Sequence, residues 1–331
     1  MRLLGCVLVS VLIAGSVTQV SAQTDPCLYR TVPVNVYAEQ GEAFTHFPAS
    51  DFQASIGDKP VGVTSAAIGN GPLHIVILID VSRSMNEGGN LKRGLEFAQD
   101  LISLASNEDS LALLTFSNQV EDTLVFGVSR TALVAEIHKL QDTDWRHVKG
   151  TKATALIDAL ANAMTLIKTP SVGDAICLVS DGGENASQSN WFKFKARLEL
   201  SGVRTYTYLP TWQSSSPIKA AENFGASELR GLAALSGGDV LQFGPGILKG
   251  VSSSTSAFGG FGGYSQEIMR DAHVFHTEIF RFEQLTLRLP EPLAKPVRWN
   301  LEVVDDLGRR NRHVHVFYPQ RLAPCTSGDG H

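Results

Sequence analysis

Three oxygen-bearing side chains, spaced two residues apart, follow one apolar run of the sequence. Asp80, Ser82 and Ser84 come directly after the segment His-Ile-Val-Ile-Leu-Ile at 74–79. A carboxylate and two hydroxyls are hard oxygen donors of the kind that bind Mg²⁺, Mn²⁺ or Ca²⁺ in proteins. The same residue types also occur in turns that cap a following helix. The local pattern therefore leaves a cation site and a capping turn as alternatives.

The elements around this segment predict an α/β fold. Apolar runs at 74–80, 110–116, 175–180, 203–209 and 239–243 have the length of strands, and several are continuously apolar, as in a parallel sheet covered on both faces. Amphipathic helices are predicted between them at 91–105, 154–168, 190–200 and 227–235. This alternation predicts a doubly wound, mostly parallel sheet flanked by helices. In such a sheet, ligands bind beyond the carboxyl ends of the strands, where Asp80 is expected.

Two later loops carry further oxygen donors after predicted strands. One is Lys149-Gly150-Thr151-Lys152-Ala153-Thr154, leading into a helix, and the other is Ser180-Asp181-Gly182-Gly183-Glu184-Asn185. Together with the D-x-S-x-S pattern of Asp80, Ser82 and Ser84, these loops make the chain, from about 73 to 243, resemble the von Willebrand factor type A domain. That family has a Rossmann-like fold and a metal-ion-dependent adhesion site.

The resemblance implies a metal-ligand set of Asp80, Ser82, Ser84, Thr154 and Asp181, with Thr151 as the register alternative to Thr154. It further implies Mg²⁺, or Mn²⁺ or Ca²⁺, as the ion. In the family, the cation grips an Asp or Glu carboxylate of a protein partner, and no catalysis is involved. Asp158 is expected to support its helix, and Glu184 to lie at the rim of the site. The alternative is a structural module in which the ion only stabilises the fold.

Enzyme classes fit these residues less well. A haloacid-dehalogenase-like phosphatase needs a second Asp two positions after the first, where this chain has Ser82, and Ser82 and Ser84 lack the G-x-S-x-G context of a serine hydrolase. The metal-dependent phosphohydrolase is therefore a remote alternative, and we expect no catalytic residues.

The start of the chain predicts export. Arg2 precedes an apolar run, and small residues end at Ala22, as in a secretory signal peptide cleaved after Ala22. The apolar run is shorter than a membrane-spanning helix requires. We therefore expect a secreted or periplasmic protein with no integral membrane segment after cleavage. The net charge of −5 gives no reason to expect a nucleic-acid partner.

The regions on either side of the core predict a smaller unit. Short strands are expected at 31–37, within 52–63, and at 275–289, 297–303 and 313–317, with a short helix at 265–272. We expect the N- and C-terminal strands to form one small β-strand module. In an oxidising compartment, Cys27 and Cys325 can pair across its ends or stay free, while Cys177 lies in a buried strand. The predicted divisions are 1–22 (signal peptide), 23–72 (β flank), 73–243 (type A domain), 244–264 (Gly/Ser-rich loop) and 265–331 (helix and β flank).

Overall fold

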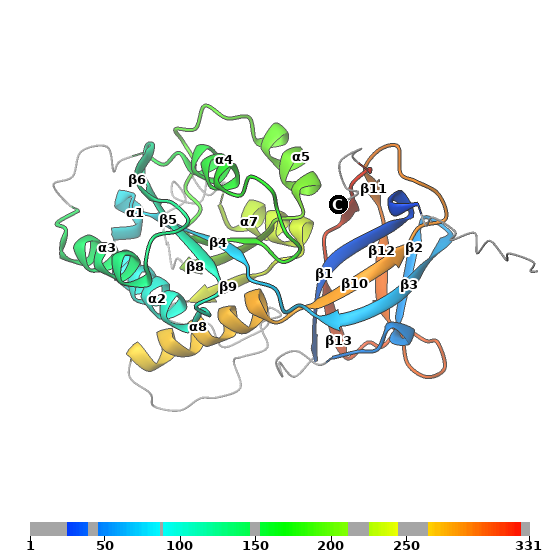
Figure 1. The fold of residues 1–331 in the computed structure, drawn as a ribbon. Helices are drawn as coiled ribbons and strands as arrows, with labels where there is room; N and C mark the ends of the chain where they lie inside the picture. Colours follow the sequence, from blue (N-terminus) through cyan, green and yellow to red (C-terminus); the bar gives the residue numbers. More distant parts are fainter. Residues whose placement is uncertain are drawn as a thin grey trace, which may run out of the picture.

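The computed structural model describes residues 25–38, 46–86, 89–145, 153–210, 225–243 and 264–325. The predicted signal peptide, Thr151 and nearly all of the Gly/Ser-rich loop lie outside these ranges. The described residues form two bodies side by side, an α/β core and a β module (Figure 1). This arrangement confirms the predicted fold class, including the small β module.

A six-stranded sheet with the order β6-β5-β4-β7-β8-β9 forms the centre of the core. All neighbours pair in parallel except β6, which lies antiparallel to β5 at one edge. In chain order the strands are β4 (His74–Asp80), β5 (Ser110–Phe116), β6 (Val120–Leu124), β7 (Ala175–Val179), β8 (Arg204–Pro210) and β9 (Val240–Phe243).

Helices cover both faces of this sheet (Figure 1). Because side chains alternate along a strand, Ile75, Ile77 and Ile79 point to one face and Val76 and Leu78 to the other. The first face packs against α2 (Asn90–Leu104), α3 (Arg130–Asp142) and α8 (Tyr264–Phe280), and the second against α4 (Leu156–Leu166), α5 (Trp191–Ser201) and α7 (Gly225–Ser236). A single helical turn, α1 (Arg83–Asn86), follows β4.

The β module is antiparallel and combines strands from both ends of the chain. Its main sheet has the order β12-β2-β3-β10-β1-β13, and β11 pairs separately with β14. The disulfide between Cys27 and Cys325 is present, with the two Cα atoms 5.3 Å apart. The strands are β1 (Tyr29–Ala38), β2 (Phe52–Ile56), β3 (Lys59–Ile68), β10 (Glu283–Arg288), β11 (Val297–Arg298), β12 (Asn300–Val303), β13 (Val314–Phe317) and β14 (Arg321–Leu322), with 3-10 turns at Pro26–Leu28 (η1) and Ala49–Asp51 (η2).

Two crossings connect the core to the β module. β3 leads into β4, and α8 leads into β10, while β3 and β10 pair with each other. At the crossing point the backbone N–H of Gly69 donates to the carbonyl of Phe282 at 2.9 Å. The core is therefore inserted between two neighbouring strands of the module.

The structure corrects two of the predicted strands. The predicted strand at 275–289 begins only at Glu283, since α8 continues to Phe280. Ile268, Ala272, Phe275 and Ile279 repeat at helical spacing and are all buried against the core, which explains the longer helix. The predicted strand at 297–303 is divided at Trp299, whose indole N–H donates to the carbonyl of Pro319 at 2.6 Å. α3 and β6 were not predicted.

None of the helices in the described part of the chain is long and apolar enough to cross a membrane.

Candidate metal centre

The loop after β4 holds the first three predicted ligands together. Asp80 is fully buried at the end of β4. Its Oδ1 accepts a hydrogen bond from the backbone N–H of Ser82 at 2.8 Å, and its Oδ2 accepts one from the hydroxyl of Ser180 at 2.7 Å. The hydroxyl oxygens of Ser82 and Ser84 are 3.1 Å apart. One tight turn thus places a carboxylate and two hydroxyls beside each other.

Thr154, the fourth predicted ligand, lies next to this turn. The residue after it, Ala155, donates its backbone N–H to the carbonyl of Ser117 at 2.7 Å. The carbonyl of Phe116, one residue earlier, accepts the N–H of Val81 at 2.8 Å. The loop after β4 and the loop before α4 are thus each bonded to one of two consecutive carbonyls at the end of β5. Thr154 is therefore positioned beside the Asp80 loop.

Asp181, the fifth predicted ligand, follows β7, which pairs with β4. Its Oδ1 accepts the backbone N–H of Gly183 at 3.1 Å. A Cβ atom on Gly183 would lie 3.4 Å from this oxygen and also 3.4 Å from the hydroxyl oxygen of Thr154. The carboxylate oxygen of Asp181 and the hydroxyl oxygen of Thr154 therefore lie on the same side of Gly183, close to one another.

Burial and charge distinguish this group of residues from a surface turn. Asp80 is 0% exposed and Asp181 is 7% exposed. Burial, and then the negative charge of Asp181, raise the pKa of Asp80 to about 7, while hydrogen bonds from Ser180 and Ser82 act in the opposite direction. Two buried carboxylates that repel each other are held at one edge of the sheet, with neutral hydroxyls around them.

The comparison with known families decides what kind of domain this core is. Residues 75–184 match the family model of the von Willebrand factor type A domain. The core of this chain carries that domain. The match confirms the resemblance seen in the sequence, and its span includes all five predicted ligands.

Solved structures similar to this chain include other type A proteins. A von Willebrand factor type A protein from Catenulispora acidiphila is 11% identical, with a TM-score of 0.45, over 91% of this chain and 75% of its own. Proximal thread matrix protein 1 from the mussel byssus is 17% identical, with a TM-score of 0.45, over 67% of this chain. The present chain spans 50% of the length of that mussel protein. Another structure of the mussel protein, with a TM-score of 0.44 and 17% identity over the same shares, has zinc in its metal-ion-dependent adhesion site. A search of curated proteins finds no match.

The donor set of the type A core fits a hard divalent cation. Two carboxylates and three hydroxyls are all oxygen donors, as Mg²⁺ and Ca²⁺ prefer. Within the part of the chain that the structure describes, no three His, Cys, Asp or Glu side chains are placed so that they could hold a metal ion together. Burial and then repulsion from Asp181 raise the pKa of Asp80, and a cation between the two carboxylates would oppose both effects.

Two residues in the third loop have roles that the sequence did not indicate. Ser180 donates to Asp80, although the two are 100 positions apart, and its hydroxyl accepts the N–H of Gly182 at 3.0 Å. Glu184, expected only at the rim, accepts four hydrogen bonds, including one from the backbone N–H of Ile157 in α4 at 2.9 Å. In the sequence, the position of Ser180 directly before Asp181-Gly182 was the one feature that could have indicated its role. No feature of the local sequence indicated that Glu184 caps α4.

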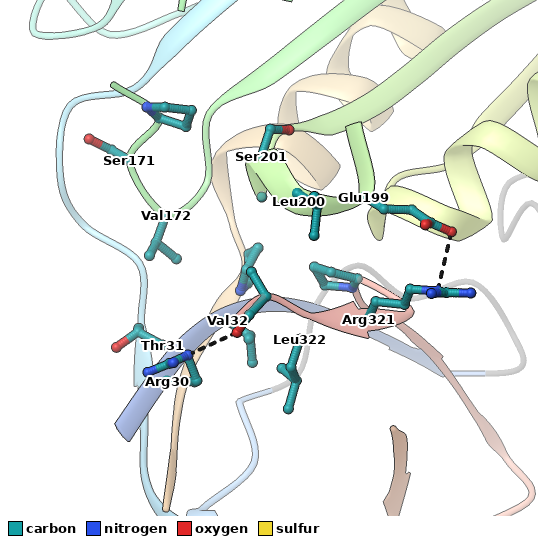
Figure 2. Close-up of a pocket in the computed structure, with 15 residues that line it drawn as sticks. Arg30, Thr31, Val32, Ser171, Val172, Glu199, Leu200, Ser201, Arg321 and Leu322 are labelled. Atoms are coloured by element: carbon teal, nitrogen blue, oxygen red, sulfur yellow. Dashed lines mark hydrogen bonds and ion pairs between the residues drawn. The ribbon is translucent and has the colours of Figure 1, made fainter. Parts of the chain in front are cut away.

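A separate groove of about 190 Å³ lies between the core and the β module (Figure 2). Residues of β1 and β14 line one side, and the loop before β7 and the end of α5 line the other. Arg321 pairs with Glu199 across it at 3.5 Å, and Arg30 donates to the carbonyls of Ala323 and Tyr29 at 3.3 and 2.6 Å. Because this groove lies at the amino ends of the core strands, it is distinct from the candidate metal centre.

Proposed function

We propose that this protein is an exported interaction module that binds a divalent cation through Asp80, Ser82, Ser84, Thr154 and Asp181, and through that cation a carboxylate of a protein partner. Mg²⁺ is the proposed ion, with Mn²⁺ and Ca²⁺ as substitutes. The observation that carries the proposal is the pair of buried carboxylates: Asp80 and Asp181 are both buried, and the neighbouring charge acting on Asp80, that of Asp181, is negative. Burying like charges together is unfavourable unless a cation joins them.

Each side chain has a distinct part in this proposal. Asp80 and Asp181 supply the negative charge, while the hydroxyls of Ser82, Ser84 and Thr154 add donors without charge. The hydrogen bonds from Ser82 and Ser180 fix the carboxylate of Asp80 in one orientation. The bound cation would supply a Lewis-acidic position that accepts one more oxygen. A partner's Asp or Glu is suited to that position because it brings the charge that the hydroxyls lack.

Export is supported by the disulfide. Bonds of this kind persist in oxidising compartments and are rare in the cytosol. Cys27 and Cys325 form such a bond between the two ends of the β module.

Thermal and chemical unfolding with and without Mg²⁺ or Mn²⁺ tests the cation site. A ligand at one hundred times its Kd stabilises a protein by about 2.7 kcal/mol. We expect this stabilisation in the wild type and its loss in Asp80→Ala. Asp58→Ala, which removes an exposed aspartate in a turn of the β module, is the matched control and should respond like the wild type. The proposal is wrong if Asp80→Ala gains as much stability from the ion as the wild type does.

Capture of a partner tests the second half of the proposal. The purified protein is used as bait in the exported fraction, with Mg²⁺ or with EDTA, and Asp80→Ala is the second bait. We expect a bound protein that EDTA and Asp80→Ala both release. Ion-dependent stability combined with EDTA-resistant capture would instead support the structural alternative.

A further inference from the structure

The residue that precedes α4 provides no side-chain cap for the helix. The first residue before the helix, Ala155, has no side chain that could accept a hydrogen bond from the first turn. The free N–H groups of a helix start need acceptors, because an unsatisfied donor at a partly buried position is costly. The third loop supplies these acceptors from about thirty positions further along the chain.

Side chains of the third loop reach the first turn of α4. Glu184 Oε2 accepts the N–H of Ile157 at 2.9 Å, and the hydroxyl of Ser187 accepts the N–H of Asp158 at 3.1 Å. Glu184 is itself held by the hydroxyl of Ser187 at 2.7 Å. The helix is therefore capped by a loop that belongs to another strand.

Residues in and just before α4 also accept hydrogen bonds from the third loop. Asp158, in the first turn of α4, accepts the backbone N–H groups of Gln188 and Ser189 at 2.9 and 2.8 Å. Thr154 and Asn185 bond reciprocally: the N–H of Thr154 donates to Asn185 Oδ1 at 2.8 Å, and the N–H of Asn185 donates to the carbonyl of Thr154 at 3.0 Å. Each loop thus satisfies backbone groups of the other.

We infer that Asp158, Glu184, Asn185 and Ser187 form an inter-loop clamp that positions Thr154 and Asp181 for the cation. Thr154 is bonded directly by the clamp, and Asp181 lies three residues before Glu184 in the same loop. The clamp makes the second and third loops one rigid unit, while Asp80, Ser82 and Ser84 belong to the other half of the site. The four residues are positioning residues, and their role in ion binding rests on the proposed function above.

Two consequences follow for the clamp residues. Preorganised ligands bind an ion more tightly because less conformational freedom is lost on binding, and partners of metal ligands typically change affinity by about 10–100-fold when removed. Loss of the clamp should also loosen both loops together, whether or not an ion is bound.

The experiment compares Asn185→Ala with Asn190→Ala. Both asparagines are exposed, lie in the same connection, and accept a backbone N–H; Asn190 accepts that of Lys193 at 3.1 Å and only caps α5. Mn²⁺ affinity is measured by electron paramagnetic resonance, and amide hydrogen exchange is measured in EDTA. We expect Asn185→Ala to weaken Mn²⁺ binding about tenfold and to speed exchange across both 154–158 and 185–189. Asn190→Ala should do neither.

A conservative variant tests whether the effects of Asn185→Ala come from the lost hydrogen bond or from a general loss of structure. Asn185→Asp keeps the acceptor for the N–H of Thr154, so it should restore slow exchange and bring the Mn²⁺ affinity back to within about threefold of the wild type. The clamp is overturned if Asn185→Ala leaves exchange at 154–158 unchanged, or if it loosens both loops but binds Mn²⁺ as the wild type does. If the wild type binds no Mn²⁺ that Asp80→Ala abolishes, the proposed function fails, and the exchange data in EDTA still decide whether the two loops are clamped.

Discussion

The two ends of the core sheet both bury charged side chains, but they satisfy them differently. At the carboxyl ends of the strands, Asp80 and Asp181 lie among hydroxyls, and burial together with the charge of Asp181 raises the pKa of Asp80 to about 7. At the amino ends, Arg204 begins β8 and is fully buried next to the β module. At the first site two carboxylates interact with each other, whereas at the second a guanidinium is surrounded by hydrogen-bond acceptors.

The two terminal nitrogens of Arg204 are surrounded by fixed groups of the protein. They lie within hydrogen-bond distance of five acceptors: Asn35 of β1, Tyr206, and the backbone carbonyls of Gly173, Glu278 and Ile279. Its guanidinium carbon also lies 4.5 Å from the ring centre of Phe282, at the crossing between core and module. These partners come from β1, α8 and the loop before β7, so one side chain joins the two bodies.

The comparison shows how to separate a structural charge from a ligand-binding one. A buried charge whose partners are fixed protein groups serves the fold, as Arg204 does. The buried pair of Asp80 and Asp181, with hydroxyls as its other donors, would instead be stabilised by a cation that the chain does not supply. Replacing Arg204 should lower stability whether or not an ion is present, whereas the effect of replacing Asp80 should depend on the ion.

Replacing Arg204 is expected to have the largest effect. In Arg204→Met several buried carbonyls lose their donor at about 1–3 kcal/mol each, so we expect a loss of about 4 kcal/mol in the free energy of unfolding. Urea unfolding in EDTA measures it. Arg321→Met is the control, because its pair with Glu199 is 3.5 Å long and its side chain is 35% exposed, and it should cost less than about 1 kcal/mol. Equal losses in the two variants would contradict a structural role for Arg204.

Removing the disulfide should act on the β module and leave the metal end alone. The double variant Cys27→Ser, Cys325→Ser should lose about 3 kcal/mol, in the usual range for a native disulfide. Its gain in stability on adding Mg²⁺ should equal that of the wild type. Reduction of the wild type gives a matched test, since Cys177 is buried and burial raises the pKa of its thiol. A changed response to Mg²⁺ would show that the two ends of the sheet are coupled.

Much of the core could be predicted because its determinants are local. The apolar run at 74–79 predicts a buried parallel strand, and its position predicts that Asp80 lies at the sheet edge. The α8 region was harder, because Phe275 to Phe280 is apolar enough for a strand and only its burial pattern identifies a helix. α3 has only three buried residues, Leu133, Ile137 and Leu140, so its periodic signal is weak.

The supporting contacts of the candidate site could not be predicted, for a physical reason. Ser180 and Asp80 are 100 positions apart, and Glu184 caps a helix that begins 28 residues before it. Hydrogen bonds of this kind depend on how loops that follow different strands contact each other. The hydrophobic periodicity of the sequence carries no information about these contacts. The candidate ligands were proposed from a family resemblance, whereas the groups that hold them required the structure.

The dependence of stability on pH is expected to be the smallest of these effects. It also tests most directly the difference between Asp80 and Arg204. The pKa of Asp80 rises from 3.8 to about 7 on folding, so the folded protein without an ion holds a proton more tightly than the unfolded chain. The contribution of Asp80 to stability should therefore be highest below about pH 4, fall as the pH rises towards about 7, and stay low above that. Between pH 5 and pH 8 in EDTA, we expect the wild type to lose about 2 kcal/mol relative to Asp80→Asn, which has no charge to bury. Saturating Mg²⁺ should abolish the difference, because the cation then takes the place of the proton. Parallel pH curves for the two proteins in EDTA would mean that the carboxylate of Asp80 is as well satisfied by the protein as Arg204 is.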